Sequence, residues 1–252
     1  MKMILKDIKE YVKLLKRTFM YRISLLPEPP KLAIIQVGNN EASNRYVRNK
    51  VKDCEEVGID VNVYSYPEEI TEFELDDELT HLQEYYDGVI IQLPLPPHIR
   101  QEVAINALLP EKDVDGFRYD SKFNPATPLG IMDYLNYCDF DLQGKNVVII
   151  GRSEILAKLM TEANATVTLC HSYSKIDDYL GLADLVVCAV GKAEFLDCRK
   201  VNCPIIDVGI NFDENGKMVG DCFNIEGKDV TSVGLLTRCA LLHNVILAKE
   251  EE

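Results

Sequence analysis

The chain has 252 residues, 47% of them hydrophobic and 27% charged, which is enough apolar material for one sizeable core or two smaller ones. Its formal net charge of −14 opposes binding to nucleic acid and to anionic membranes, so neither is an expected partner. No apolar run reaches the roughly 20 residues that a membrane span needs, and the amphipathic N-terminus is too charged for a secretion signal. These features favour a cytoplasmic protein.

The first half of the chain alternates between helical and strand patterns. Apolar residues recur at helical spacing near the N-terminus, at Ile4, Ile8, Val12 and Leu15. Beyond them we predict a buried strand in KLAIIQV, a helix over about Glu41–Val57 that ends at Gly58, an alternating strand in DVNVYSY, a helix over Phe73–Tyr86 and a buried strand in GVIIQLPL. This order is typical of a parallel sheet covered by helices.

A second series of strands begins at DLQGKNVVIIG, where a turn with Gly144 precedes an apolar run. Further strands are predicted in ATVTLC, ADLVVCAV and CPIIDVGI, and the closing LLTRCALLHNVILA reads as an apolar helix. We therefore predict an α/β protein of two domains with a cleft between them. The expected limits are residues 1–138 and 139–235, with a C-terminal helix over 236–252 that packs back on the first domain.

The eight cysteines form no C-x-x-C pair, and several lie in apolar runs, so reduced and mostly buried thiols are expected. The histidines do not cluster with them at ligand spacing, so no metal site is predicted.

NVVIIGRSEIL predicts a nucleotide site in the second domain. A strand, a glycine turn and a helix start place free backbone N–H groups where a phosphate can bind. The G-x-G-x-x-G fingerprint is not met, because Ala157 stands where a further glycine is expected, and a strand–turn–helix of any α/β protein looks similar. The next strand ends without a carboxylate, so Arg152 and Ser172 suit NADP better than NAD, unless they are surface residues that never meet.

Tyr46 and Lys50 lie one turn apart on the predicted helix over residues 41–57. Lys50 falls about 60° from Val47 on the apolar seam, so its amine lies at the margin of the core, where partial desolvation favours the neutral, proton-accepting form. A lysine that simply covers apolar surface fits the same position.

Gln92 and the D-x-D-G sequence at Asp113 and Asp115 complete the candidates of the first half. Gln92 ends an apolar strand at the sheet edge where ligands of α/β proteins bind, and it needs a partner such as a lysine amine or neighbouring backbone. Asp113 and Asp115 precede Gly116, so they form either a simple turn or a carboxylate site for the N–H edge of a heterocycle.

Together these segments resemble the bifunctional methylenetetrahydrofolate dehydrogenase/cyclohydrolase family. The matching motifs stand in family order between about residues 31 and 221: VGNNEASNRYVRNKVKDCEEVGI, DGVIIQLPLPPHI, PEKDVDGF, PATPLG, GKNVVIIGRSEI, ATVTLCHSYS, ADLVVCAVGK and IIDVGIN followed by ENGKMVGD. The resemblance implies a folate-binding catalytic first domain, a Rossmann-like second domain and a homodimer.

The resemblance also implies a role for each matching residue. Lys50 is the catalytic amine, Tyr46 stacks on the pterin, Gln92 bonds to Lys50, and Asp115 anchors the pterin ring. The NADP-binding residues are Gly151, Arg152, Ser153, His171 and Ser172. Family members oxidise 5,10-methylenetetrahydrofolate with NADP⁺ and hydrolyse the 5,10-methenyl product to 10-formyltetrahydrofolate.

The chain departs from the family pattern in its second half. Leu156, Ala157 and Leu159 replace a valine–glycine and a proline of the nucleotide loop, the following helix is about one turn shorter, and a late folate- and nicotinamide-lining loop is reduced to Thr231–Arg238. Two alternatives therefore accompany the bifunctional enzyme: a cyclohydrolase with weakened NADP use, and a non-catalytic folate- or nucleotide-binding relative. A two-domain dehydrogenase of another substrate would not explain YVRNK together with QLPLP and KDVDG.

Overall fold

The computed structural model describes residues 5–213, 218–224 and 228–251. Ile4 and part of the ENGKMVGD motif, both used above, lie outside these ranges. The contacts divide the chain into two compact units, which we call the N-terminal unit (Val12–Ala126 with Arg238–Glu252) and the C-terminal unit (Met1–Tyr11 with Thr127–Thr237). The domain limits given above remain a prediction.

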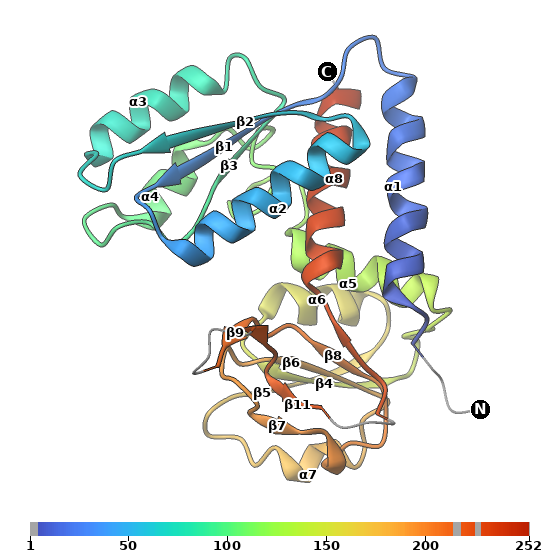
Figure 1. The fold of residues 1–252 in the computed structure, drawn as a ribbon. Helices are drawn as coiled ribbons and strands as arrows, with labels where there is room; N and C mark the ends of the chain where they lie inside the picture. Colours follow the sequence, from blue (N-terminus) through green and yellow to red (C-terminus); the bar gives the residue numbers. More distant parts are fainter. Residues whose placement is uncertain (1–4, 214–217, 225–227, 252) are drawn as a thin grey trace. The chain divides into compact units, whose positions relative to one another are not determined.

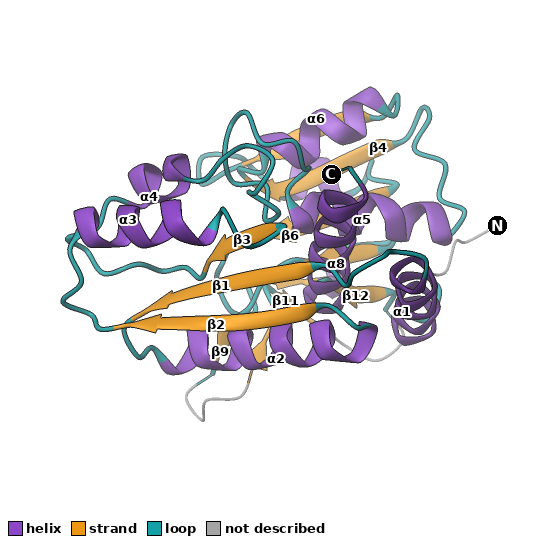
Figure 2. Ribbon diagram, turned by 90° about the horizontal axis from the view of Figure 1, so that it is seen from above, coloured by secondary structure: helices purple, strands orange, loops and turns teal. Residues whose placement is uncertain are grey.

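The N-terminal unit contains a parallel three-stranded sheet in the order β2-β1-β3 (Figure 2). Its strands are β1 Lys31–Val37, β2 Asp60–Tyr66 and β3 Gly88–Ile91. Helix α2 (Glu41–Val57) covers one face, and α3 (Glu72–Leu82) and α4 (Gln101–Ala107) cover the other (Figure 1). The second face holds a hydrophobic core in which alternate residues of β1 pack with the apolar side of α3. The parallel sheet with helices on both faces confirms the predicted architecture.

Two longer helices complete the N-terminal unit. They are α1 (Ile8–Ser24) and α8 (Gly234–Glu250). The part of α1 that begins at Val12 and the part of α8 that begins at Arg238 belong to this unit. They are tied together by Arg22, whose guanidinium binds Glu250 with Nε–Oε1 and Nη2–Oε2 distances of 2.9 and 2.5 Å. Lys249 Nζ of α8 lies 3.2 Å from Oδ1 of Asp87, the residue before β3, and so links the helix to the sheet.

The C-terminal unit contains a parallel five-stranded sheet in the order β12-β8-β6-β4-β5. The strands are β4 Asn146–Gly151, β5 Thr166–Cys170, β6 Leu185–Ala189, β8 Ile205–Asp207 and β12 Val230–Ser232. Counted from β4 along the chain, the spatial order is 2-1-3-4-5, a doubly wound order whose switch point lies between β4 and β6. A Rossmann-like unit was predicted, and the sheet confirms it.

The remaining elements of the C-terminal unit are short, apart from α5. The helices are α5 (Ala126–Tyr137), α6 (Glu154–Glu162), α7 (Asp177–Leu180) and the 3-10 turn Cys198–Lys200. Two small pairs of strands join β7 (Leu196–Asp197) to β11 (Cys222–Phe223), and β9 (Asn211–Phe212) to β10 (Met218–Val219).

All eight cysteines are free thiols, and seven are buried, with Cys203 partly exposed, as the sequence predicted. Within the described ranges, no cluster of three or more His, Cys, Asp or Glu side chains could hold a metal ion. Nor is any helix of that part of the chain long and apolar enough to cross a bilayer.

Candidate active site and nucleotide site

Helix α2 positions the first candidate residues. It begins at Asn40, whose side chain accepts a hydrogen bond from Ser43 N at 3.0 Å, and it ends at Gly58, which adopts a left-handed φ of 94° that favours glycine. Val47 and Cys54 are buried and Val51 is half-buried, so the apolar seam of the helix faces inward. The opposite side is exposed and carries Arg45, Arg48, Lys52, Glu55 and Glu56.

The structure brings Lys50 and Asp115 together. Lys50 Nζ lies 3.6 Å from Asp115 Oδ2, and the two side chains are only 15% and 11% exposed. One residue comes from the middle of α2 and the other from the loop after α4, so the pair forms only in the folded unit. Tyr46 is half-buried one turn before Lys50, and burial raises the pKa of its phenol. An amine, a carboxylate and an aromatic ring therefore meet on the margin of the core.

Gln92 follows β3, as predicted, but its amide is turned differently. Its backbone N–H donates to Ile35 O at 2.8 Å, and Nε2 donates to the carbonyl of the next residue, Leu93, also at 2.8 Å. Its buried Oε1 has no hydrogen-bond partner among the described residues. The expected bond between Lys50 and this oxygen is therefore absent, because the amine pairs with Asp115 instead. An unpaired buried acceptor is costly and fits a position that a ligand N–H completes.

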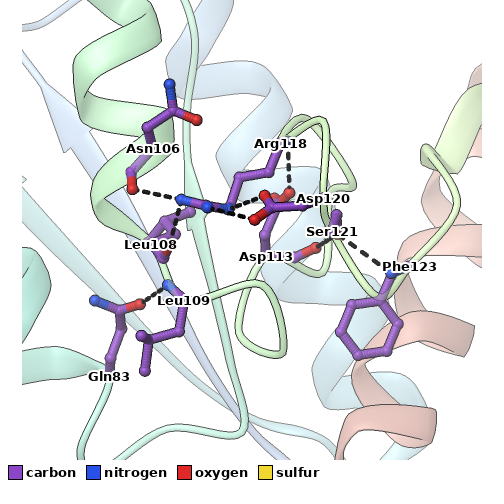
Figure 3. Close-up of polar contacts among 9 residues, drawn as sticks. All are labelled: Gln83, Asn106, Leu108, Leu109, Asp113, Arg118, Asp120, Ser121 and Phe123. Atoms are coloured by element: carbon purple, nitrogen blue, oxygen red, sulfur yellow. Dashed lines mark hydrogen bonds and ion pairs between the residues drawn. The ribbon is translucent and has the colours of Figure 1, made fainter.

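Asp113 and Asp115 divide the two roles that D-x-D-G suggested. Asp113 is almost fully buried, and its Oδ2 accepts the backbone N–H of Arg118 at 2.7 Å, which is a turn-forming contact (Figure 3). Burial raises the pKa of Asp113, while these backbone N–H contacts lower it. Asp113 therefore shapes the loop, and Asp115 supplies the carboxylate that reaches Lys50.

The loop that carries Asp115 is fixed by Arg118. Its Nη1 donates to the carbonyl of Leu108 at 2.8 Å and also to that of Asn106, at the end of α4, and its Nε donates to Asp120 at 2.8 Å (Figure 3). Ser121 adds a bond from its hydroxyl to Asp113 O at 2.9 Å. The dense set of backbone contacts holds the D-x-D-G segment in one conformation.

Gly151 ends β4 at the switch point of the C-terminal sheet. Its φ of +142° is rarely adopted by other residues, and a Cβ added there would lie 2.3 Å from Ala189 O on the neighbouring β6. Glycine is therefore required for the close approach of the two strand ends. Ser153 precedes α6 as its N-cap residue but makes no side-chain capping bond, so its hydroxyl is available beside the helix N-terminus.

Arg152, His171 and Ser172 follow the carboxyl ends of β4 and β5, which pair side by side in register from Asn146↔Thr166 to Ile150↔Cys170. All three residues are exposed, and no carboxylate stands among them. Two backbone contacts shape the His171 turn: its N–H donates to Ser174 Oγ at 3.0 Å, and its Nδ1 accepts from Tyr173 N at 3.2 Å. A cation and a hydroxyl at one sheet edge fit a phosphate-bearing nucleotide.

The sequence reading missed Asp53, which lies one turn after Lys50 on α2. Asp53 is 6% exposed, and its carboxylate accepts a hydrogen bond from Lys16 Nζ of α1 at 2.6 Å. Its other oxygen forms an ion pair with Arg238 Nε of α8 at 3.0 Å, without hydrogen-bond geometry. Helix periodicity could have predicted its burial, because Asp53 lies four residues before the buried Val57 and thus on the inner side of the helix.

Both halves of the chain match family models. Residues 1–115 match the catalytic domain of tetrahydrofolate dehydrogenase/cyclohydrolase, and residues 125–252 match its NAD(P)-binding domain. The bifunctional protein FolD of Staphylococcus aureus (strain Newman) is 40% identical over 247 residues, which cover 88% of this chain and 86% of the relative.

Solved structures agree with this match. The bifunctional enzyme FolD from Campylobacter jejuni is 34% identical with a TM-score of 0.91, covering 96% of this chain and 97% of that one. The Trypanosoma brucei dehydrogenase-cyclohydrolase, solved with NADP cofactor and inhibitor, is 27% identical with a TM-score of 0.89, covering 100% and 98%. On these matches over nearly the whole chain, the protein belongs to the tetrahydrofolate dehydrogenase/cyclohydrolase family.

Proposed function

We propose that this protein is a bifunctional enzyme that oxidises 5,10-methylenetetrahydrofolate with NADP⁺ and hydrolyses the resulting 5,10-methenyl cation to 10-formyltetrahydrofolate. The observation that carries the proposal is the half-buried Lys50–Asp115 pair, formed by α2 and the loop after α4, with Tyr46 one turn before Lys50. These three side chains supply proton transfer, charge and a stacking surface.

Hydrolysis requires a group that takes a proton from the attacking water. A neutral Lys50 amine can accept that proton while water adds to the cationic methenyl carbon, whereas an ammonium cannot. The bond from this carbon to N5 then breaks, and N5 takes the proton back from the ammonium as it leaves. Asp115 Oδ2, 3.6 Å from the amine, then stabilises the ammonium that forms. The low exposure of both side chains keeps the solvent from screening this interaction.

The folate is held by the same group of side chains. Tyr46 offers its ring for stacking on the pterin, and the unpaired Oε1 of Gln92 accepts a pterin N–H. Asp115 has a second carboxylate oxygen for the N–H edge of the ring. In this proposal Gln92 acts on the substrate, and its bond to Lys50 is not needed.

The C-terminal unit fits a nucleotide at the switch point of its sheet. Gly151 allows the backbone to approach the pyrophosphate, the Ser153 hydroxyl and the N-terminus of α6 favour phosphate, and Arg152 with Ser172 suits the 2′-phosphate of NADP. His171 follows β5 in the same loop as Ser172. When bound, NADP⁺ supplies the hydride acceptor, with NAD⁺ as the alternative.

A direct assay tests both activities. Purified protein with 5,10-methylenetetrahydrofolate and NADP⁺, or NAD⁺ in parallel, should produce reduced cofactor and then lose methenyl absorbance. Folded protein that turns over neither cofactor but hydrolyses added methenyl substrate would favour the hydrolase alternative. Protein that binds folate and performs neither reaction would contradict both enzymatic functions and favour the non-catalytic alternative.

A lysine variant tests the proton-accepting role. Lys50→Met should lower hydrolysis by at least about 10²-fold, the usual contribution of a positioned general base, while a folate analogue still binds. Lys52→Met is the matched control, because Lys52 is exposed on the same helix. Retained hydrolysis in Lys50→Met would exclude the role.

We extend the proposal to assembly and location. The family to which the chain belongs favours a homodimer and a cytoplasmic location. Light scattering of the purified protein would test the first, because a monomer mass at micromolar concentration would contradict it.

A further inference from the structure

We propose that Asn244 of α8 is a positioning residue that fixes the loop of Asp115 so that its carboxylate stays at Lys50; this inference rests on the function proposed above. Asn244 is 1% exposed, and Nδ2 donates both of its hydrogens to backbone carbonyls, to Val114 O at 2.8 Å and to Asn124 O at 3.0 Å. These partners lie 130 and 120 residues earlier in the sequence.

The two carbonyls lie on either side of the Asp115–Gly116 turn. Gly116 has a φ of +72°, and a Cβ added to it would lie 2.7 Å from Pro125 N, so the segment after Asn124 packs directly on the turn. The Asp115 carbonyl accepts from Ala126 N at 3.4 Å across the same contact. One buried amide therefore joins the start and the end of the loop.

The Val114 end of the loop is also fixed. Its side chain packs on β3, because a Cβ added to Gly88 would lie 2.7 Å from Val114 Cγ1. Asp115 follows immediately, so a small rotation of the Val114 carbonyl moves the Asp115 side chain. Asn244 restrains that carbonyl, and the carboxylate that depends on it lies 3.6 Å from Lys50 Nζ.

Asn244 does not act on the substrate itself in this arrangement, because both Nδ2 hydrogens are used by protein carbonyls and the residue, at 1% exposure, is closed to a ligand. Its effect must pass through Asp115. A displacement of about 1 Å of a catalytic group can reduce a rate by roughly 10²-fold, so a single lost restraint is measurable.

A double-mutant cycle tests this path. Asn244→Leu and Asn244→Asp each remove the donors while keeping nearly the same size, and each is made in the wild type and in Asp115→Asn. The readouts are kcat and KM for hydrolysis of 5,10-methenyltetrahydrofolate, binding of a folate analogue by calorimetry, and thermal unfolding. Glu250→Gln is the matched control, because it weakens a polar tie of α8, to Arg22 of α1, away from the Asp115 loop.

In the wild-type background, both Asn244 variants should lower kcat by about ten- to a hundredfold, with KM and analogue binding changed much less. In the Asp115→Asn background, the same substitutions should lower kcat by less than about threefold, because the group that they displace is already lost. Glu250→Gln should leave kcat unchanged.

Equal losses in both backgrounds, or no loss in the wild type, would overturn the positioning role. If Asn244→Leu does not fold, Asn244→Asp decides the question by the same criterion. Wild-type protein that binds the analogue but does not hydrolyse the substrate would overturn the proposed function as well, and this outcome is distinct from an active wild type with additive losses.

Discussion

Replacement of Asp53 by asparagine should destabilise the N-terminal unit strongly although it changes no volume. The Asp53 carboxylate accepts a hydrogen bond from Lys16 through Oδ1 at 2.6 Å, and its Oδ2 lies 3.0 Å from Arg238 Nε in an ion pair without hydrogen-bond geometry. The side chains of Lys16 and Arg238 are 13% and 23% exposed, so both cations are partly removed from water. Asp53→Asn keeps the shape and leaves two partly buried cations without the charge between them.

The expected cost follows from the partners that remain. Breaking one side of a buried ion pair costs about 3–5 kcal/mol, because the remaining charge is left uncompensated. Lys16 keeps Glu56 Oε2 at 2.7 Å, although Glu56 is 52% exposed, so the lower end of the range applies. A loss of about 3 kcal/mol corresponds to a decrease in Tm of roughly 6–12 °C for a chain of this size.

Urea and thermal unfolding followed by circular dichroism would measure this change. The triple variant Lys16→Met/Asp53→Leu/Arg238→Met provides the decisive comparison, because replacing a whole buried ion group by apolar side chains is often neutral or stabilising. We expect it to lie within about 1 kcal/mol of the wild type. A loss below about 1 kcal/mol in Asp53→Asn, or a triple variant as unstable as the single one, would refute this reasoning.

Two further predictions concern the nucleotide site and the pH dependence of stability. Gly151→Ala places a Cβ 2.3 Å from Ala189 O at a φ of +142°, so it should abolish NADP binding in a calorimetric titration while hydrolysis of added methenyl substrate continues; unchanged NADP binding would contradict the close approach. Hydrogen bonds from Arg100 lower the pKa of Glu72 from 4.5 to about 2, so the ionised form is favoured in the folded state. The stability that Glu72→Gln removes should therefore be fully present above about pH 4.5 and vanish as the pH falls to about 2. Urea unfolding of the wild type and of Glu72→Gln across this range should show their free energies of unfolding converging. A constant difference would rule out the Glu72–Arg100 pair as the cause.

Helices and strands were predictable where local signals set their ends. The bounds of α2 agree with the prediction, because Asn40 caps its first turn and Gly58 ends it through its own left-handed conformation. Helix α3 was predicted to extend to Tyr86 but ends at Leu82. After Leu82 the backbone continues in tighter turns, with Glu84 N donating to His81 O and Tyr85 N to Leu82 O. The Gln83 side chain is held there by Leu109 N, a contact from a distant loop that no local pattern contains.

In the candidate site, too, contacts between residues that are distant in the sequence could not be predicted. Lys50 was placed correctly at the margin of the core, because helix periodicity alone determines that position. Its partner could not be predicted, because Asp115 reaches it through a loop whose path depends on buried contacts of Asp113 and Arg118. Periodicity likewise says nothing about the rotation of a side-chain amide, so the unpaired oxygen of Gln92 became visible only in the structure.

Helix α8 connects these observations, because within the N-terminal unit it contacts both α2, which carries Lys50, and the loop that carries Asp115. Arg238 reaches α2 through Asp53, one turn from Lys50, and Asn244 reaches the loop on both sides of Asp115. The amine and the carboxylate belong to segments that are far apart in the sequence and are joined directly only by a 3.6 Å contact. A contact of that length is too weak to set its own geometry, so the distance must be fixed by the frame around it. The late helix supplies part of that frame, and for this reason substitution of Asn244, which does not touch folate, should lower the rate of hydrolysis.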